Sequence, residues 1–214
     1  MHVLITAGPT REPIDEVRFI SNRSSGQIGL ALAEAAAEAG HDVTLLLGPV
    51  LVLASLGERV QVHRFTTTAE LEALLGELFP AADLLVMAAA VADYRVTRAA
   101  AGKTARSKSL KIQLEGTPDL VAGVAARKRP DQRVIAFALE EAETLEVRAR
   151  DKMQRKGVDG IVANPLATMD ADRIAGVLLT ADGGRHEPGP MSKPDFARWL
   201  IEVLTADERT GRHN

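Results

Sequence analysis

Short apolar runs alternate with helix-period patterns along almost all of this chain of 214 residues. The apolar runs predict strands at 3–6, 42–47, 60–65, 84–89, 110–114, 134–137, 160–163 and 174–180, and the helical patterns cover 26–39, 68–79, 118–128, 142–157 and 192–204. This alternation is typical of a mostly parallel sheet with helices on both faces. We expect a single α/β domain over 1–214, with a mobile flap at 95–109, a small C-terminal β-hairpin turning at Asp182-Gly183-Gly184, and a disordered tail at 205–214.

The composition excludes several kinds of site and partner. The chain has no cysteine, which rules out disulfides, thiolate zinc sites, iron–sulfur clusters and a cysteine nucleophile. A net charge of −3 argues against nucleic acid as a partner, because binding to phosphate backbones needs a basic face. The longest apolar run, 84–92, is about half the ~18 residues of a membrane span, and residues 1–7 lack the features of a signal peptide. We expect a cytoplasmic protein with neither a nucleic-acid nor a membrane partner.

The loop between the first strand and the first helix is long, polar and punctuated by glycine and proline. Its residues 6–29 read T-A-G-P-T-R-E-P-I-D-E-V-R-F-I-S-N-R-S-S-G-Q-I-G. Such a loop joins the carboxyl end of a strand to the amino end of a helix, where Rossmann-like sheets bind nucleotides. The candidate phosphate-binding residues are Gly8, Ser24, Ser25 and Gly26, although these glycines could serve only helix–sheet packing. NAD binding is disfavoured, because the loop is not a compact G-x-G-x-x-G and the second strand ends L-L-L-G-P at 45–49, without a ribose-binding acid.

Two acidic residues lie where an α/β sheet could use them. Asp93 follows a run of small residues after the predicted strand 84–89, where it could accept a hydroxyl group or assist a metal, or simply cap a turn. Thr117-Pro118-Asp119 provides an N-cap, a proline at the first helical position and an acid in the first turn, which helix initiation alone also explains. The five histidines show no metal-ligand spacing.

Basic residues in two regions are candidates to neutralise phosphates. Ala101-Gly102-Lys103-Thr104 imitates the end of a Walker A loop, but Thr97 stands where the first glycine should be, so we reject a P-loop. Lys103 could still meet a triphosphate as a point charge, or be an ordinary solvated lysine. Lys152 and Lys156 lie one helical turn apart and could present two ammonium groups on one face, as could any solvated amphipathic helix.

Four sequence blocks together resemble phosphopantothenoylcysteine synthetase, the phosphopantothenate–cysteine ligase of coenzyme A biosynthesis. They read I-T-A-G-P-T-R-E-P-I-D at 5–15, R-F-I-S-N-R-S-S-G at 18–26, A-A-V-A-D-Y-R at 89–95 and P-D-L-V-A-G-V-A at 118–125. The resemblance covers residues 2 to about 204 and implies a stand-alone synthetase domain without the flavin-dependent decarboxylase half. It implies that the carboxylate of 4′-phosphopantothenate attacks CTP with Mg²⁺ assistance, giving an acyl-cytidylate from which L-cysteine displaces CMP. No flavin is needed.

The resemblance also implies roles for individual residues. Asn22 and Lys103 match catalytic positions, the asparagine contacting the acyl intermediate and the flap lysine closing over the triphosphate. Arg18, Asn22 and Ala90 match the phosphopantothenate site, with Arg18 reaching across the interface of a homodimer. The nucleotide pocket corresponds to Met87, Ala88, Ala89, Asp93, Lys103, Pro118, Asp119, Leu120, Val121, Phe137, Lys152 and Lys156. The resemblance gives no protein ligands for the metal.

Two segments depart from the family pattern. The pattern G-F-A-A-E-T reads A-F-A-L-E-E at 136–141, which alters the pocket floor near the base, and the lysine-rich flap is thinned to K-T-A-R at 103–106. Two other functions therefore remain as alternatives. One is a Rossmann-type NAD(P)-dependent oxidoreductase, and the other is a non-catalytic nucleotide-binding subunit.

Overall fold

The protein is built on one eight-stranded sheet, seen in a computed structural model that describes residues 1–51, 56–169 and 171–206. The strands in spatial order are β13 (Arg185–His186), β12 (Val177–Thr180), β10 (Gly160–Pro165), β9 (Arg133–Glu140), β6 (Leu84–Met87), β1 (His2–Ala7), β4 (Asp42–Leu47) and β5 (Val60–Arg64). The run from β10 to β5 is parallel, and β12 and β13 are antiparallel. The order reverses at β1, which pairs with β4 on one side and β6 on the other. The expected fold class is confirmed, including the hairpin between β12 and β13.

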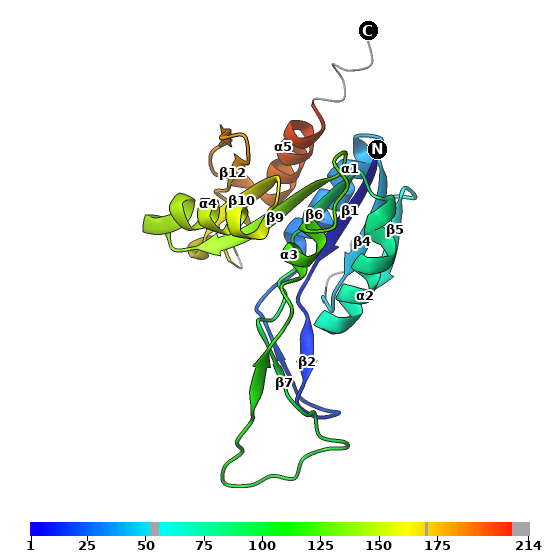
Figure 1. Cartoon of the computed structure of the whole chain (residues 1–214), viewed down its shortest axis with the longest axis vertical. Coiled ribbons are helices and arrows are strands. Elements are labelled where there is room, and N and C mark those ends of the chain that lie inside the picture. Colours follow the sequence, from blue (N-terminus) through cyan, green and yellow to red (C-terminus); the bar gives the residue numbers. More distant parts are fainter. Residues whose placement is uncertain (52–55, 170, 207–214) are drawn as a thin grey trace.

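Helices cover both faces of the sheet (Figure 1). One face carries α1 (Gln27–Glu38) and α5 (Lys193–Thr205), and the other carries α2 (Thr68–Leu78), α3 (Leu120–Ala125) and α4 (Leu145–Lys156). Short 3₁₀ turns lie at η1 (Phe79–Ala81), η2 (Ala142–Thr144) and η3 (Leu166–Thr168). Along β1, Ile5 packs under α1 and α5 while Leu4 packs on the opposite face, as the alternation of side chains along a strand requires. No helix in the described part of the chain is long and apolar enough to cross a membrane.

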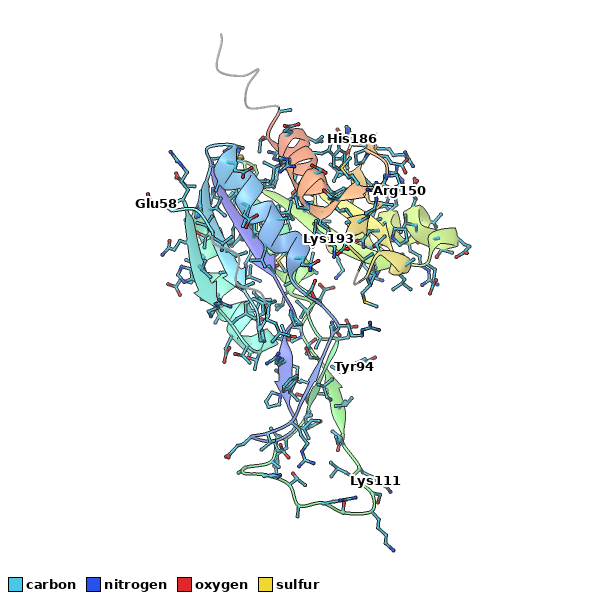
Figure 2. All side chains as sticks on the ribbon, turned by 180° about the vertical axis from the view of Figure 1, so that it is seen from behind. Glu58, Tyr94, Lys111, Arg150, His186 and Lys193 are labelled. Carbon is cyan, nitrogen blue, oxygen red and sulfur yellow. The ribbon has the colours of Figure 1, made fainter. Side chains whose placement is uncertain are left out.

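An elongated arm projects from the carboxyl edge of the sheet (Figure 1). It contains two antiparallel hairpins, β2 (Arg11–Pro13) with β3 (Phe19–Ser21) and β7 (Tyr94–Val96) with β8 (Leu114–Gly116). Tyr94 lies along the arm and Lys111 at its far end (Figure 2). The sequence analysis missed the first hairpin. The strand predicted at 110–114 is wrong, because only Leu114 of that range belongs to β8 and residues 97–113 form the segment that connects β7 to β8. The mobility expected at 95–109 stays a prediction.

Three other boundaries differ from the sequence analysis. Asp119, not Thr117, is the N-cap of α3, and its side chain accepts a hydrogen bond from the Ala122 amide at 3.1 Å. The strand expected at 174–180 is broken into β11 (Arg173–Ile174), which pairs with β14 (Met191–Ser192), and β12. Gly176 lies at the break, where a Cβ atom would come within 2.7 Å of the Phe196 ring. The disordered tail expected at 205–214 does not start at 205, because Thr205 is the last residue of α5 and is buried, and residues 207–214 lie outside the described residues.

Candidate functional site

The loops that follow β1 and β6 lie side by side at the carboxyl edge of the sheet. Pro9 and Ala90 form a parallel bridge just beyond the two strands. The Thr10 amide donates to the Ala90 carbonyl at 3.2 Å, and the Ala90 amide donates to the Gly8 carbonyl at 2.9 Å. Ligand crevices form where the strand order of an open α/β sheet reverses. This edge is therefore the place in the fold where a ligand site is expected.

A cavity of about 660 Å³ opens beside these loops. Its walls come from the end of β3, the loop after β6, the start of α3, the end of β9 and one face of α4. Twelve residues carried over from the family line it: Asn22, Met87, Ala89, Ala90, Asp93, Pro118, Asp119, Leu120, Val121, Phe137, Lys152 and Lys156. The structure thus brings together residues that are up to 134 positions apart, from Asn22 to Lys156. Their individual roles stay predictions.

The wall after β6 is held in place by hydroxyl and amide groups. The Thr10 hydroxyl accepts a hydrogen bond from the Ala92 amide at 3.0 Å, and the Ser21 hydroxyl donates to the Thr10 carbonyl at 2.7 Å. Asn22 Nδ2 donates to the Val91 carbonyl at 2.8 Å. Asn22 is therefore fixed at the rim of the cavity by the same loop whose small residues form the wall.

A buried acid, Glu12, is connected to this wall through the side chains of Thr68 and Thr10. Glu12 is 4% exposed, and its carboxylate accepts hydrogen bonds from the Thr68 amide at 2.8 Å and the Thr68 hydroxyl at 2.7 Å. The Thr68 hydroxyl also lies 3.4 Å from the Thr10 hydroxyl. The sequence analysis missed this network. Its one local signal is that Thr10 and Glu12 alternate along an extended segment, which places both side chains on one side.

Both lysines of α4 that line the cavity are paired with acids. Lys156 Nζ lies 2.7 Å from each carboxylate oxygen of Asp119. Lys152 pairs with Glu140, whose side chain is 5% exposed. Partial burial acts to raise the pKa of Asp119, but the hydrogen bonds from Lys156 and from the Ala122 amide outweigh it and hold that pKa below its usual range. Glu140 lies in the segment 136–141 that the family pattern places at the pocket floor, but its pairing with Lys152 was not predicted, because nothing in a strand pattern distinguishes a strand-end acid that pairs with a lysine.

The start of α1 borders a second cavity of about 220 Å³. Ser24, Ser25 and Gly26 line this cavity together with Ala88, and it shares several lining residues with the larger one. Gly26 has a φ of 73°, and a Cβ atom there would lie 2.7 Å from Val50 Cγ1. No side chain caps α1, so the first amides of the helix are available at this end. Of the four phosphate-binding candidates, only Gly8 is absent from the lining.

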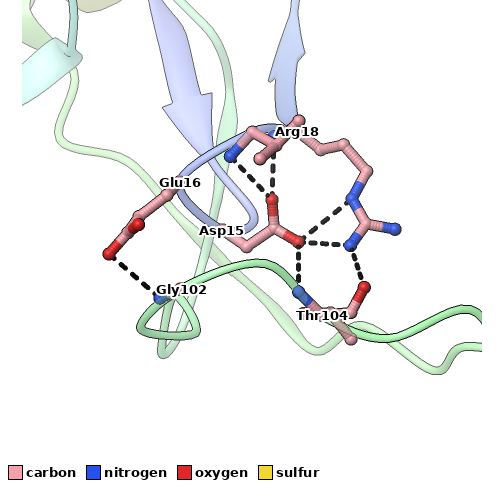
Figure 3. Close-up of polar contacts among 6 residues, drawn as sticks. Asp15, Glu16, Arg18, Gly102 and Thr104 are labelled. Atoms are coloured by element: carbon pink, nitrogen blue, oxygen red, sulfur yellow. Dashed lines mark hydrogen bonds and ion pairs between the residues drawn. The ribbon is translucent and has the colours of Figure 1, made fainter.

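Arg18 and Lys103 lie away from both cavities. They belong to the arm, Arg18 in the turn between β2 and β3 and Lys103 in the segment between β7 and β8. Arg18 forms an ion pair with Asp15, and its Nη2 donates to the Thr104 carbonyl at 2.8 Å (Figure 3). The structure therefore does not bring these two cations to the nucleotide pocket of the same chain.

Within residues 1–51, 56–169 and 171–206, no group of three or more histidines, cysteines or acids is arranged to hold a metal ion. Besides Asp119, which is paired with Lys156, the exposed carboxylate on the wall of the larger cavity is Asp93. Its backbone carbonyl accepts a hydrogen bond from the Thr117 amide at 3.0 Å, which ties the loop after β6 to the start of α3. A carboxylate that belongs to no cluster of metal-ligating residues in the described ranges suits a metal ion that arrives with a ligand better than one resident in the protein.

The doubly wound sheet, the reversal at β1 and the cavity at its carboxyl edge define an α/β protein with a small-molecule site at its topological switch point. The chain belongs to the family described as DNA/pantothenate metabolism flavoprotein C-terminal domain, whose model matches residues 1–207. The resemblance found in the four sequence blocks is confirmed.

Relatives and solved structures agree with this family. The coenzyme A biosynthesis bifunctional protein CoaBC of Escherichia coli (strain K12) is 41% identical over 222 aligned residues, which cover 99% of this chain and 54% of that protein. The crystal structure of the C-terminal domain of CoaBC is 30% identical with a TM-score of 0.81, covering 98% of this chain and 96% of that one. A Cab2 mutant in complex with phosphopantothenate-cysteine shares the fold at 19% identity, with a TM-score of 0.79 and coverage of 98% and 86%. The chain spans about half the length of the curated relatives it matches.

Proposed function

We propose that this chain is a phosphopantothenate–cysteine ligase, which joins 4′-phosphopantothenate and L-cysteine in coenzyme A biosynthesis. One observation carries the proposal. The cavity at the carboxyl edge of the sheet gathers twelve residues that match the family's nucleotide and pantothenoyl positions. The name of the E. coli relative, a coenzyme A biosynthesis protein, and the phosphopantothenate-cysteine bound to Cab2 support the same reaction.

The reaction has two covalent steps. In the first, a carboxylate oxygen of 4′-phosphopantothenate bonds to the α-phosphorus of CTP, and the bond to pyrophosphate breaks. In the second, the amine of cysteine bonds to the acyl carbon, CMP leaves, and the amine loses a proton. Asn22, whose side-chain amide is held by the Val91 carbonyl at the cavity rim, would bind the acyl group.

For this reaction the protein must mainly orient the substrates and neutralise the charge of the triphosphate. Lys152 and Lys156 would stabilise the negative charge of the triphosphate, and in the structure their partners Glu140 and Asp119 already fix both ammonium groups at the wall. Holding two reactants in a reactive geometry can supply roughly 7–11 kcal/mol of a barrier. Lys103 would add a further positive charge beside the triphosphate once the segment between β7 and β8 reaches a cavity.

Mg²⁺ would enter with the triphosphate. Asp93 fits this arrangement, because Mg²⁺ is commonly held by one or two carboxylates together with substrate phosphates. When bound, the ion neutralises phosphate charge and assists the departure of pyrophosphate. The reaction has no redox step and needs no flavin. It uses a nucleoside triphosphate and a free thiol, which suits the reducing cytoplasm.

A homodimer is the proposed assembly. The arm exposes six large apolar side chains: Val17, Phe19, Tyr94, Leu110, Ile112 and Leu114 are 38% to 59% exposed. An apolar surface of this kind on a soluble protein marks an interaction site, and the turn that carries Arg18 is part of the same arm. A second copy covering this surface would let Arg18 reach the phosphate of phosphopantothenate in the partner's site. Sedimentation should give a dimer, and a monomer of 22.9 kDa at micromolar concentration would contradict the shared site.

A coupled assay tests the function. The full chain is supplied with 4′-phosphopantothenate, L-cysteine, Mg²⁺ and either CTP or ATP, and pyrophosphate release is followed. We expect turnover with CTP. Turnover with ATP alone would change only the choice of nucleotide, whereas no pyrophosphate with either nucleotide would refute the ligase.

A further inference from the structure

Two segments of the arm that are distant in sequence are bound to each other. The turn between β2 and β3 lies beside residues 100–104 of the segment between β7 and β8 (Figure 3). The Ala100 amide donates to the Ile14 carbonyl at 3.0 Å, and the Glu16 amide donates to the Gly102 carbonyl at 3.3 Å. The Gly102 amide in turn donates to Glu16 Oε1 at 3.0 Å. Residues 100–104 are therefore anchored to the turn, although they lie within the predicted flap.

Asp15 is the centre of this contact. Its side chain is fully buried, although its turn belongs to the protruding arm. Oδ1 accepts hydrogen bonds from the Val17 amide at 2.9 Å and the Arg18 amide at 2.8 Å. Oδ2 accepts from Arg18 Nε at 3.0 Å, from Arg18 Nη2, and from the Thr104 amide at 3.1 Å. The Arg18 guanidinium, assisted by the backbone amides, holds the pKa of this carboxyl well below its usual range against the effect of burial.

Asp15 and Arg18 together hold both backbone groups of Thr104. The Thr104 amide donates to Asp15, and the Thr104 carbonyl accepts from Arg18 Nη2 at 2.8 Å. Gly102 is bound to Glu16 in the same way. Lys103 lies between these two anchored residues with its side chain exposed. Its backbone position is therefore set by the turn that carries Arg18.

The charge of the segment explains why an acid is needed at this point. Residues 97–113 contain five basic residues and no acid. Bringing the Arg18 guanidinium against this segment would create repulsion between cations, which the buried carboxylate of Asp15 offsets. Arg18 uses Nε and Nη2 toward Asp15 and Thr104, and its side chain is 41% exposed. Nη1 is the nitrogen that an anionic substrate can meet.

We propose that Asp15 is a positioning residue that holds Arg18 and the Lys103 segment together as one cationic unit for the anionic substrates. The role of the unit in catalysis rests on the proposed ligase function, but its assembly does not. Because one carboxylate binds both partners, Arg18 and Lys103 are presented together. Whichever site the arm of one subunit reaches, both cations reach it as a pair.

The test is Asp15→Asn in the full chain. The Asn oxygen can still accept from the Val17 and Arg18 amides, but its NH₂ group faces the donors of Arg18 and Thr104. We expect kcat/KM for 4′-phosphopantothenate and CTP to fall roughly tenfold to a hundredfold, the range for misplaced reacting groups. Asp131→Asn is the matched control, since Asp131 accepts from Arg129 Nε and Nη2 at 3.1 Å on an exposed loop before β9. It should change kcat/KM less than about twofold.

Adding Asp15→Asn to a chain that already lacks both cations separates positioning from general stabilisation. In a chain that already carries Arg18→Gln and Lys103→Gln, adding Asp15→Asn should lower kcat/KM by less than about a further twofold. The side chains through which Asp15 acts are already absent from that chain. The same loss in both backgrounds would mean that Asp15 serves only the fold, and would overturn the proposal.

Trypsin gives a readout that does not depend on catalysis. Cleavage after Lys103 requires residues 102–104 to leave the turn, so native wild-type protein should be cut slowly there. Asp15→Asn and Arg18→Gln should each be cut at least several-fold faster, while Asp131→Asn should match wild type. Arg18→Gln serves if Asp15→Asn does not fold, because the Arg18 side chain is partly exposed. If the wild-type chain has no ligase activity, the proposed function fails, but the trypsin experiment still tests whether Asp15 holds the cationic unit together. Unchanged cleavage in both variants would refute the existence of this unit.

Discussion

A methyl group added at Gly29 tests how closely α1 must approach β1. Gly29 lies in the first turn of α1, above the end of β1. A Cβ atom at this position would lie 2.4 Å from Ala7 Cβ and 3.0 Å from Ala7 Cα. Ala7 is fully buried, and neither of these atoms belongs to a flexible side chain. The helix must therefore shift away from the strand in Gly29→Ala.

Two opposing effects set the magnitude of that change. Alanine is favoured over glycine in a helix by about 0.8–1.0 kcal/mol. Overpacking a buried contact typically costs about 1–3 kcal/mol. Because the added Cβ atom would lie only 2.4 Å from Ala7 Cβ, we expect a cost toward the upper end of that range. The steric term wins, so we expect Gly29→Ala to lower the free energy of unfolding by about 1–2 kcal/mol. Nucleotide binding should weaken as well, because the start of α1 borders the smaller cavity.

Gly76→Ala is the matched control for the helix effect alone. Gly76 lies inside α2, and no heavy atom lies within 4 Å of a Cβ atom built there. Urea unfolding should show Gly76→Ala stabilised by about 0.5–1 kcal/mol and Gly29→Ala destabilised. If both variants are more stable than wild type, the close approach of α1 to β1 does not constrain residue 29 and the reasoning is wrong.

Three further predictions concern the charges of the site. Lys103→Gln should slow acyl-nucleotide formation about 10²-fold if the lysine acts as one transition-state donor, measured by pyrophosphate release in quenched flow. Lys152→Gln should lower the free energy of unfolding by about 1–3 kcal/mol because it leaves the buried Glu140 with only its longer ion pair to Arg148, at 3.9 Å. Lys156→Gln, whose partner Asp119 is 45% exposed, should cost less than about 1 kcal/mol in urea unfolding. Because the pKa of Asp119 is lowered in the folded state, Asp119 contributes to the free energy of unfolding above its usual pKa near 3.9, and this contribution is lost as the pH falls toward the lowered pKa. In acid titrations, the stability difference between wild type and Asp119→Asn should therefore be constant above pH ~5 and shrink below pH ~4.

Local patterns predicted most of the segments that form the sheet, with the error at 110–114, but not how they pair. The runs that became β1 and β4 are both apolar, and nothing in either shows that β1 lies between β4 and β6. The hairpin of β2 and β3 was missed because its strands have three residues each and one ends in Pro13. The turn between these strands is also held by residues 100–104, which no short window of sequence contains.

The site was predictable where a residue type has a local reason. Gly26 needs a positive φ and close packing, and the loop pattern had already marked it. The motif comparison located the residues that line the larger cavity, but their partners were not predictable from pattern. Glu12 joins Thr68 across 56 residues, and Asp15 joins Thr104 across 89. These contacts depend on the tertiary fold, so a single sequence gives no signal for them.

The most direct test of the account is a single-turnover reaction without cysteine. Wild-type protein is mixed with 4′-phosphopantothenate, Mg²⁺ and CTP labelled at the α-phosphate, and the products are separated after acid quench. We expect one pyrophosphate per site and a labelled acyl-cytidylate that accumulates, then converts to CMP and the amide when cysteine is added. If pyrophosphate forms only when cysteine is present, or if the label never becomes attached to phosphopantothenate, the two-step ligase mechanism at this cavity is contradicted.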